Sequence, residues 1–487
     1  MMQQELFESL VEQEVSQYGL NMGFYACDGI TTPEGSTVIS SDSYFHSNLP
    51  SDFSPLSNYD AVMMSENVGD IAGLSATSIE DVLSWWAEIE EKYNISSDYS
   101  IENEGVYDTS FLNATKASIV MSPEDMEVEG ETSLFHMLKA YGEAMEMGQR
   151  ELVNVIVEYI KEKASPIGST IERISFNLFH SGNQVEYIKQ ESMKNFNVAF
   201  KAFYEIFPYG RFAHLAANSA IIEEIIRDSR KVHIIDFDMG EGIQWSAMLG
   251  EFGKFRKELK LTSVRTNMQI CNFEVTKSHL LDYANGSGLK LEVNEIMIGD
   301  LVREIEGSEE REFLAFNCMV GLPHMRRTSD RNQVMEFLMI AKRLLYSKKG
   351  IITFGDGEDL EKMDRCNGYG SFFDECLMHY HALYESMERN FPDRLTEARI
   401  AMEFLFVSPY VSSLYWCQKW QNVKDEAGFN ENLGLTECRL SDESVMEAKE
   451  LVDERQSLYK IRVEGQQGNE MVLEWRGTPL VRVSAWK

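Results

Sequence analysis

The sequence predicts an α/β fold in which a doubly wound sheet carries an α-helical cap, preceded by a disordered acidic N-terminal segment. From residue 231 onward, short apolar runs alternate with helical patterns, which is typical of a parallel sheet covered by helices on both faces. Between residues 131 and 230 the apolar residues recur with a helical period instead. The first 130 residues have neither pattern.

Charge and composition exclude several classes of protein. The 487 residues include 79 acidic and 45 basic side chains, a net charge of −34 that repels phosphate. Broad electrostatic binding to nucleic acid or to an anionic membrane is therefore not expected. No run of about 18 apolar residues predicts a membrane span, and no basic stretch with a following apolar run predicts a secretory signal. The seven scattered cysteines predict reduced thiols, as in the cytosol or nucleus.

The segment 1–130 carries 24 acidic residues and two basic ones, and it lacks sustained periodicity. Such a composition buries too little apolar surface to offset chain entropy, so disorder is expected. One amphipathic helix is predicted near 78–93, where Ser78 opens a capping-box pattern. The apolar face of this helix consists of Ile79, Val82, Leu83, Trp86 and Ile89. It either docks on the folded domain or folds onto a partner.

The helical part begins with a leucine-rich stretch at 131–190. Two amphipathic helices are expected, broken near Gly148. Their stripe consists of Leu134, Leu138, Met145, Leu152, Ile156 and Ile160. A leucine stripe is more typical of a core than of a dimer seam, and both interpretations stay open. We therefore treat Leu134, Leu138, Met145 and Leu152 as a candidate partner interface.

The sheet is predicted from five buried apolar runs followed by three that are separated by short turns. The first five lie at 231–237, 261–266, 289–296, 312–317 and 350–355. Helical patterns between them predict parallel strands. The last three, at 458–465, 469–475 and 480–486, predict an antiparallel edge.

The turn after the first strand is where a doubly wound sheet holds a nucleotide-like cofactor. Here it reads Asp236-Phe-Asp238-Met-Gly240-Glu-Gly242. It resembles the D-x-G-x-G-x-G turn of S-adenosylmethionine-dependent methyltransferases, with Asp238 in place of the first glycine. The likeness predicts a Rossmann-like, methyltransferase-type sheet. The second strand, in LTSVRTN, has no carboxylate to hold ribose hydroxyls, so two departures weaken cofactor binding.

Other conspicuous residues have structural interpretations. His233 alternates with apolar neighbours and is expected to be a hydrogen-bonded core histidine. Asp236 is expected to bond the backbone of the following turn, and Trp245 to be a packing anchor, as is Trp486. His379 and His381 are two apart on a predicted helix and make a poor metal pair. The sequence has no recognisable catalytic constellation.

Several blocks in order resemble the plant GRAS family. Val232-His233-Ile234-Ile235-Asp236 matches its VHIID signature, and the chain ends in the SAW triplet Ser484-Ala485-Trp486. The resemblance divides the GRAS domain, 131–487, into a first leucine-rich region (131–190), a VHIID region (203–268), a second leucine-rich region (273–308), a PFYRE region (312–409) and a SAW region (412–487). The Arg-Glu dipeptide that the family often has is missing after residue 390. Within the family, EGIQW and LAFNCMVGLPHM resemble the nodulation-signalling-pathway-two subgroup.

The resemblance implies a nuclear plant transcriptional regulator without a cofactor, a metal or enzymatic activity. Its partners would be other GRAS proteins and transcription factors, in a homodimer or heterodimer. No helix carries a basic stripe, so DNA contact is expected to be indirect. The alternatives are direct sequence-specific DNA binding, or a methyltransferase or S-adenosylmethionine-like small-molecule binding protein that uses the remnant crevice.

Overall fold

The computed structural model describes residues 123–487 apart from eight gaps and one single residue. The gaps are 181–195, 226–230, 256–257, 266–272, 308–311, 324–330, 392–395 and 426–434, and the single residue is 359. Both the acidic segment and the helix expected at 78–93 lie outside the described residues. The first described helix, α4, spans Pro123–Glu146 and so begins before the domain boundary expected at 131.

One eight-stranded sheet runs through the molecule in the order β3-β2-β1-β4-β5-β8-β7-β6. The strands are β1 (Lys231–Phe237), β2 (Glu258–Arg265), β3 (Leu291–Met297), β4 (Phe313–Val320), β5 (Gly350–Asp356), β6 (Tyr459–Glu464), β7 (Glu470–Trp475) and β8 (Thr478–Trp486). The first five are parallel, and β8, β7 and β6 add an antiparallel extension beside β5. The doubly wound sheet expected from the sequence is thus confirmed. Strand β1 has the expected bounds, whereas β2 starts earlier and β4 ends later than expected.

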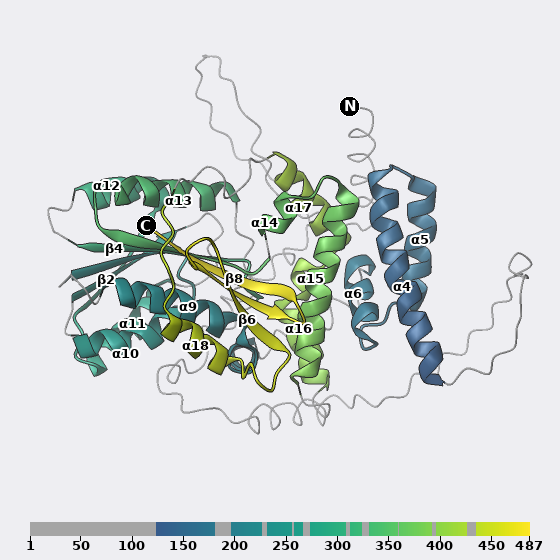
Figure 1. Ribbon diagram of the computed structural model, residues 1–487, viewed down its shortest axis with the longest axis horizontal. Helices are drawn as coiled ribbons and strands as arrows, with labels where there is room; N and C mark the ends of the chain where they lie inside the picture. The colour runs from purple at the N-terminus through teal and green to yellow at the C-terminus, as the bar shows by residue number, and fades with distance from the viewer. Residues whose placement is uncertain are drawn as a thin grey trace, which may run out of the picture.

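Helices cover both faces of the parallel part, as Figure 1 shows. One face packs on α9 (Pro208–Ile225), α10 (Ile243–Phe255) and α11 (Phe273–Gly286), and α18 (Asp442–Leu451) packs on α9. The other face packs on α12 (Leu301–Glu306) and α13 (Arg331–Leu345). Side chains of β1 alternate between the two layers, because successive residues of a strand point to opposite faces. Ile234 joins the α10 layer, and Ile235 joins the α13 layer.

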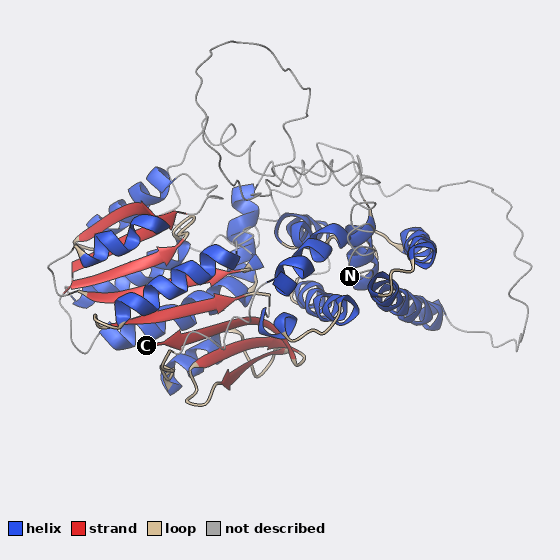
Figure 2. Cartoon of the chain, turned by 90° about the horizontal axis from the view of Figure 1, so that it is seen from above, coloured by secondary structure: helices blue, strands red, loops and turns tan. Residues whose placement is uncertain are grey.

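The remaining helices form a cap at the end of the sheet where β8, β7 and β6 lie (Figures 1 and 2). They are α4, α5 (Arg150–Lys163), α6 (Thr170–Phe179), α8 (Phe196–Ile206), α14 (Leu360–Asp364), α15 (Tyr369–Arg389), α16 (Thr396–Phe406) and α17 (Ser413–Asp425). Short 3-10 turns occupy Ile298–Asp300 and Ser408–Tyr410. The central helix is α15, which packs on α4, α6, α16, α17 and β8. The break expected between the first two helices occurs at Gly148, whose φ is 67°.

The long helix α15 connects the cap to the sheet through one continuous apolar core. Its buried Phe373 contacts Tyr141 of α4 and Trp416 of α17, with ring centroids 5.2 and 5.0 Å apart. Among the described residues, none of the helices is long and apolar enough to cross a membrane. The cysteines in this part of the chain are free thiols.

Candidate functional site: the glycine turn and the helical cap

The glycine turn lies at the carboxyl end of β1, between Phe237 and the start of α10. Three of its residues have left-handed backbone conformations: Asp238 at φ 60°, Gly240 at 58° and Gly242 at 70°. Asp is among the few non-glycine residues that adopt this region readily, which explains how Asp238 takes a backbone conformation that favours glycine. The turn is held to β2, because the amide of Met239 donates to Ser263 Oγ at 3.2 Å.

Gly242 allows close packing against α11 rather than the helix–strand approach that a glycine at this position usually serves. A Cβ atom at Gly242 would lie 2.9 Å from Thr276 Cγ2 and 3.3 Å from Leu280 Cδ1, both on α11. Thr276 Oγ1 also donates to the carbonyl of Gly240 at 2.8 Å. The turn and α11 therefore form one packed unit.

Asp236 lies at the centre of a buried polar network. Its Oδ2 accepts a hydrogen bond from Trp245 Nε1 at 2.6 Å, and its Oδ1 accepts one from Asn317 Nδ2 at 2.8 Å. Two side chains, one on α10 and one on β4, thus donate hydrogen bonds to the Asp236 side chain, while the bond expected to the turn backbone stays a prediction. Trp245, expected as a packing anchor, is fully buried and also a hydrogen-bond donor.

The network continues from Asn317 to residues that the sequence did not single out. Asn317 and Gln244 exchange amide hydrogen bonds of 3.1 and 3.2 Å. Gln244 Nε2 also donates to Asn218 Oδ1 at 3.1 Å, and Thr353 Oγ1 donates to Asn317 Oδ1 at 2.9 Å. The available signal was Asn317 itself, a lone amide in the otherwise apolar strand FLAFNCMV. A buried amide must find partners, so its presence predicts a network.

This arrangement ties β1, β4, β5, α9 and α10 together at the edge of the sheet where a cofactor would bind. Satisfied buried networks of this kind make the core rigid. Strand β2 ends at Arg265, whose guanidinium lies 3.9 Å from the Glu295 carboxylate on β3. The geometry therefore suits a structural junction better than a cofactor site.

His233 is buried on β1, as its apolar neighbours predict. Its Nε2 lies 2.8 Å from Thr262 Oγ1, and its Nδ1 lies 3.2 Å from a carboxylate oxygen of Glu312. Burial lowers the pKa of His233, so the ring is neutral at pH 7. The hydrogen bond from His233 lowers the pKa of Glu312 to about 2. Because both ring nitrogens are engaged inside the sheet layer, His233 has the surroundings of a structural residue.

The rest of the VHIID and SAW residues form the sheet itself. Val232 and Ile234 are buried on the α10 side of β1. Ala485 of β8 lies opposite Thr353 of β5, so the SAW triplet closes the junction between the parallel and antiparallel parts. The side chains at its ends bond each other, with Trp486 Nε1 donating to Ser484 Oγ at 2.8 Å.

The candidate interface residues of the cap separate into two groups. Leu134, Leu138 and Met145 are buried in the intramolecular core, where α4 packs on α15. The expectation that these three contact a partner is corrected, because they already have partners within the chain. Leu152 of α5 is 46% exposed and remains available to another molecule.

A buried cluster of ion pairs lies within the helical cap. Arg399 and Glu403 pair one turn apart on α16, and Arg173 of α6 donates from Nε to Glu403 at 3.0 Å. Arg173 also pairs with Glu388 of α15 at 3.1 Å. This cluster joins α6, α15 and α16, and three of its members, Arg173, Arg399 and Glu403, are almost completely buried.

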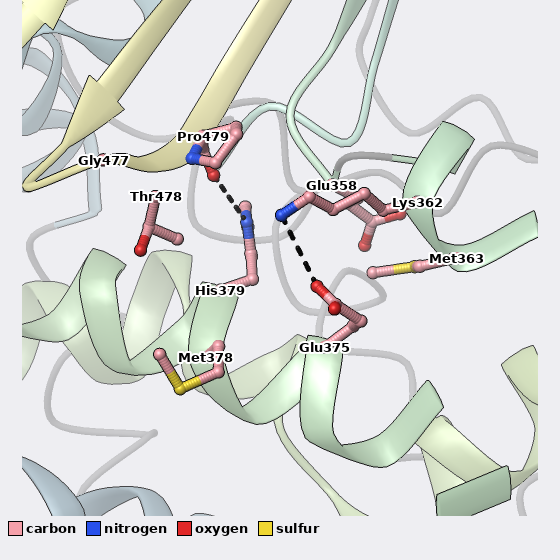
Figure 3. A pocket seen from close by; sticks show the side chains of 9 residues that line it. All are labelled: Glu358, Lys362, Met363, Glu375, Met378, His379, Gly477, Thr478 and Pro479. Carbon is pink, nitrogen blue, oxygen red and sulfur yellow. Dashed lines mark hydrogen bonds and ion pairs between the residues drawn. The ribbon is translucent and has the colours of Figure 1, made fainter. Parts of the chain in front are cut away.

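A pocket lies at the joint between the cap and the sheet, away from the glycine turn (Figure 3). Glu358, Lys362 and His379 line it together with Thr478 of β8. His379 faces Pro479, with Nδ1 3.2 Å from its carbonyl oxygen (Figure 3). His381 instead packs edge-on against Phe135, so the two histidines point to different places, as their spacing predicts. Within the described ranges, no cluster of three metal-ligating side chains occurs.

Comparison with known proteins identifies the family. The model of the GRAS domain family matches residues 134–487. The chain belongs to the GRAS domain family. Protein NODULATION SIGNALING PATHWAY 2 of Medicago truncatula is 26% identical over 396 residues, which is 72% of this chain and 75% of that protein. DELLA protein RGA of Arabidopsis thaliana is 23% identical over 406 residues, covering 77% of this chain and 64% of that protein.

A solved GRAS structure shares the fold. The crystal structure of SCL7 from Oryza sativa matches with a TM-score of 0.53 and 24% identity, over 73% of this chain and 99% of the other. The GRAS relatives are plant transcriptional regulators that work in signalling and in complexes, and members of the family are regulatory proteins rather than enzymes. In this GRAS protein the VHIID block lies in β1 and the SAW block at the end of β8.

Proposed function

We propose that this GRAS protein is a nuclear transcriptional co-regulator that acts through protein–protein contacts and has no methyltransferase activity. It would work in developmental, hormone or symbiosis signalling, with other GRAS proteins or transcription factors as partners. Contact with DNA would then pass through those partners.

One observation carries the non-catalytic part of the proposal. Asp236, the first residue of the glycine-turn motif, accepts hydrogen bonds from Trp245 and Asn317 inside the protein. A carboxylate in a methyltransferase turn would be needed near the cofactor, whereas this one joins a helix to two strands. Arg265 at the end of β2 gives independent support for the absence of methyltransferase activity. A cofactor site of this kind uses a carboxylate near that strand end to bind the ribose hydroxyls, and Arg265 is a cation.

Thermal-shift titration with S-adenosylmethionine and S-adenosylhomocysteine tests the proposal. A ligand at 100 times its dissociation constant adds about 2.7 kcal/mol to stability, so a true site gives a clear shift. We expect no shift in this protein under conditions in which a known S-adenosylmethionine-dependent enzyme responds. Transfer of a labelled methyl group by the purified full chain would overturn the proposal.

The partner-binding part needs a separate experiment. Affinity purification from plant nuclei with mass spectrometry should recover transcription factors or other GRAS proteins. A mobility shift with purified protein alone tests direct DNA binding, and we expect none at physiological salt because of the net charge of −34. A sequence-specific shift by the protein alone would contradict indirect contact.

A further inference from the structure

The outer face of α5 carries an apolar stripe that no described part of the chain covers. Leu152, Val155 and Tyr159 are 46%, 68% and 36% exposed. Their spacing of three and four residues places them along one line of the helix, about 10 Å long. We call these three residues the α5 stripe. Figure 1 shows α5 at the outer side of the cap, next to α4.

The stripe is additional to the face that α5 buries. Val153, Ile156, Val157 and Ile160 already pack in the core. A helix on the surface of a globular protein normally needs one apolar face, with polar residues opposite. Of the thirteen large apolar side chains that the described residues expose, five lie between 147 and 167, in α5 and the turns beside it. Such concentration is typical of a protein-binding surface.

A row of carboxylates borders the stripe. Glu151, Glu158 and Glu162 are all exposed, and their spacing of seven and four residues aligns them along one edge. The basic residues of α5 lie at its ends: Arg150 begins the helix, and Lys161 and Lys163 lie in its last turn. Lys161 pairs with Glu158 at 3.2 Å, but this pair is exposed and therefore weak. The edge thus remains acidic.

Tyr159 is prepared for binding before a partner arrives. Its hydroxyl lies 3.2 Å from Ser133 Oγ of α4, which holds the ring toward the neighbouring helix. A restrained aromatic side chain loses less entropy on binding than a free one. Tyrosine is also enriched among the residues that contribute most to interfaces.

We propose that the α5 stripe binds an amphipathic helix of a different protein that carries basic residues along the edge facing Glu151, Glu158 and Glu162. This inference rests on the proposed function and names the chemistry of the partner. A second copy of the chain fits less well. In a two-fold antiparallel pair of α5 helices the same edges meet, so the two acidic rows would repel each other.

Designed peptides can test whether the α5 stripe prefers a helix with a basic edge, without knowledge of the natural partner. Two helical peptides would share one leucine face and differ only at one edge, which carries lysine in the first and glutamate in the second. Fluorescence anisotropy with the full chain should show at least tenfold tighter binding of the lysine peptide. The double variant Glu158→Lys and Glu162→Lys should reverse this preference. Equal affinity for both peptides, or a preference that survives the charge reversal, would overturn the proposal.

A matched pair of variants distinguishes specific peptide binding at the α5 stripe from nonspecific binding to exposed apolar side chains. Leu152→Gln with Val155→Gln should weaken binding of the lysine peptide at least tenfold. Met339→Gln on α13 with Tyr346→Gln just after the end of α13 changes two side chains that are 50% and 97% exposed, and this variant should leave binding unchanged. Circular dichroism melting of both variants would confirm that the fold is retained. Equal loss in both pairs would contradict a specific site.

Two other occupants give distinct outcomes. Dimerisation of the full chain that Leu152→Gln with Val155→Gln abolishes would assign the stripe to a second copy and overturn the proposal. Trp85 and Trp86 lie in the helix expected near 78–93. If the lysine peptide binds only after both are changed to serine, the N-terminal segment is the occupant of the α5 stripe, and the proposal is overturned. Methyl transfer by the protein would refute the proposed function without changing any peptide affinity, so the two failures are distinguishable.

Discussion

Asn317 lies directly opposite Asp236 in the register of β4 and β1, and its amide donates a 2.8 Å hydrogen bond to the Asp236 carboxylate. The bond connects the last residue of the VHIID block to a residue near the start of the expected PFYRE region, across two adjacent parallel strands. The Asp236 carboxyl group is buried, so its stability there depends on the donors around it. The motif is therefore a structural joint whose strength can be measured.

Replacing Asp236 by alanine should destabilise the fold. The indole N–H of Trp245 and one N–H of Asn317 would lose their partner in a buried site, at about 1–3 kcal/mol for each unsatisfied group. We expect a total loss of about 2–6 kcal/mol in the free energy of unfolding, measured by urea denaturation. Asp236→Asn retains one acceptor oxygen and should cost less. Equal stability of the alanine variant and the parent would contradict the network.

Gly242→Ala should cost about 1–3 kcal/mol, because the residue combines a φ of 70° with a Cβ position 2.9 Å from Thr276 Cγ2. The loss of stability should come from disturbed packing between the glycine turn and α11. Gly286→Ala is the matched control, since an added Cβ there has no neighbour within 4 Å. The control should change stability by less than about 0.5 kcal/mol. Thermal melts that rank the two variants in the opposite order would refute this explanation.

Acidification from pH 7 to pH 5 should weaken the fold through buried histidines. Burial lowers the pKa of His214 to about 3 and that of His379 to about 4, against about 6.5 in the unfolded chain. Both rings stay neutral in the fold at pH 5 while the unfolded state gains protons. The stability they contribute is therefore complete above pH 6.5 and falls as the pH drops toward the folded pKa values. The loss is about 2 kcal/mol for each histidine over this range.

A series of urea midpoints between pH 7 and pH 5 measures this slope. The variant His379→Gln removes one titrating group, so its stability difference between the two pH values should be smaller by about 2 kcal/mol. His233, whose pKa burial also lowers, contributes in the same direction. A slope unchanged by His379→Gln would show that this ring is not buried in its neutral form.

Glu403→Gln should be among the most damaging single changes in the cap. Arg173 and Arg399 would keep their charges in a buried site without the carboxylate between them, and breaking a buried pair in this way costs about 3–5 kcal/mol. Glu306→Gln serves as the control, because its pair with Arg343 is largely exposed. Its loss should be below about 1 kcal/mol. Similar denaturation midpoints for both variants would contradict a buried cluster.

The strands were predictable because each one is a short apolar run with its own signal in the sequence. Periodicity also predicted that helices cover both faces of the parallel strands, and the VHIID and SAW blocks indicated the family. The candidate interface was only partly predictable. Leu134, Leu138 and Leu152 share one helical pattern, yet the first two are buried against α15 and the third is exposed.

By itself, the sequence determined which residues form strands and helices, which face of each element is apolar and which family the chain resembles, because local spacing sets these properties. Only the tertiary structure decided which element covers each face. It placed Asp236 beside Asn317, 81 residues away, and Glu403 beside Arg173, 230 residues away. Hydrogen bonds and ion pairs of this kind depend on distances of about 3 Å between segments remote in the chain, and one-dimensional spacing does not contain such distances.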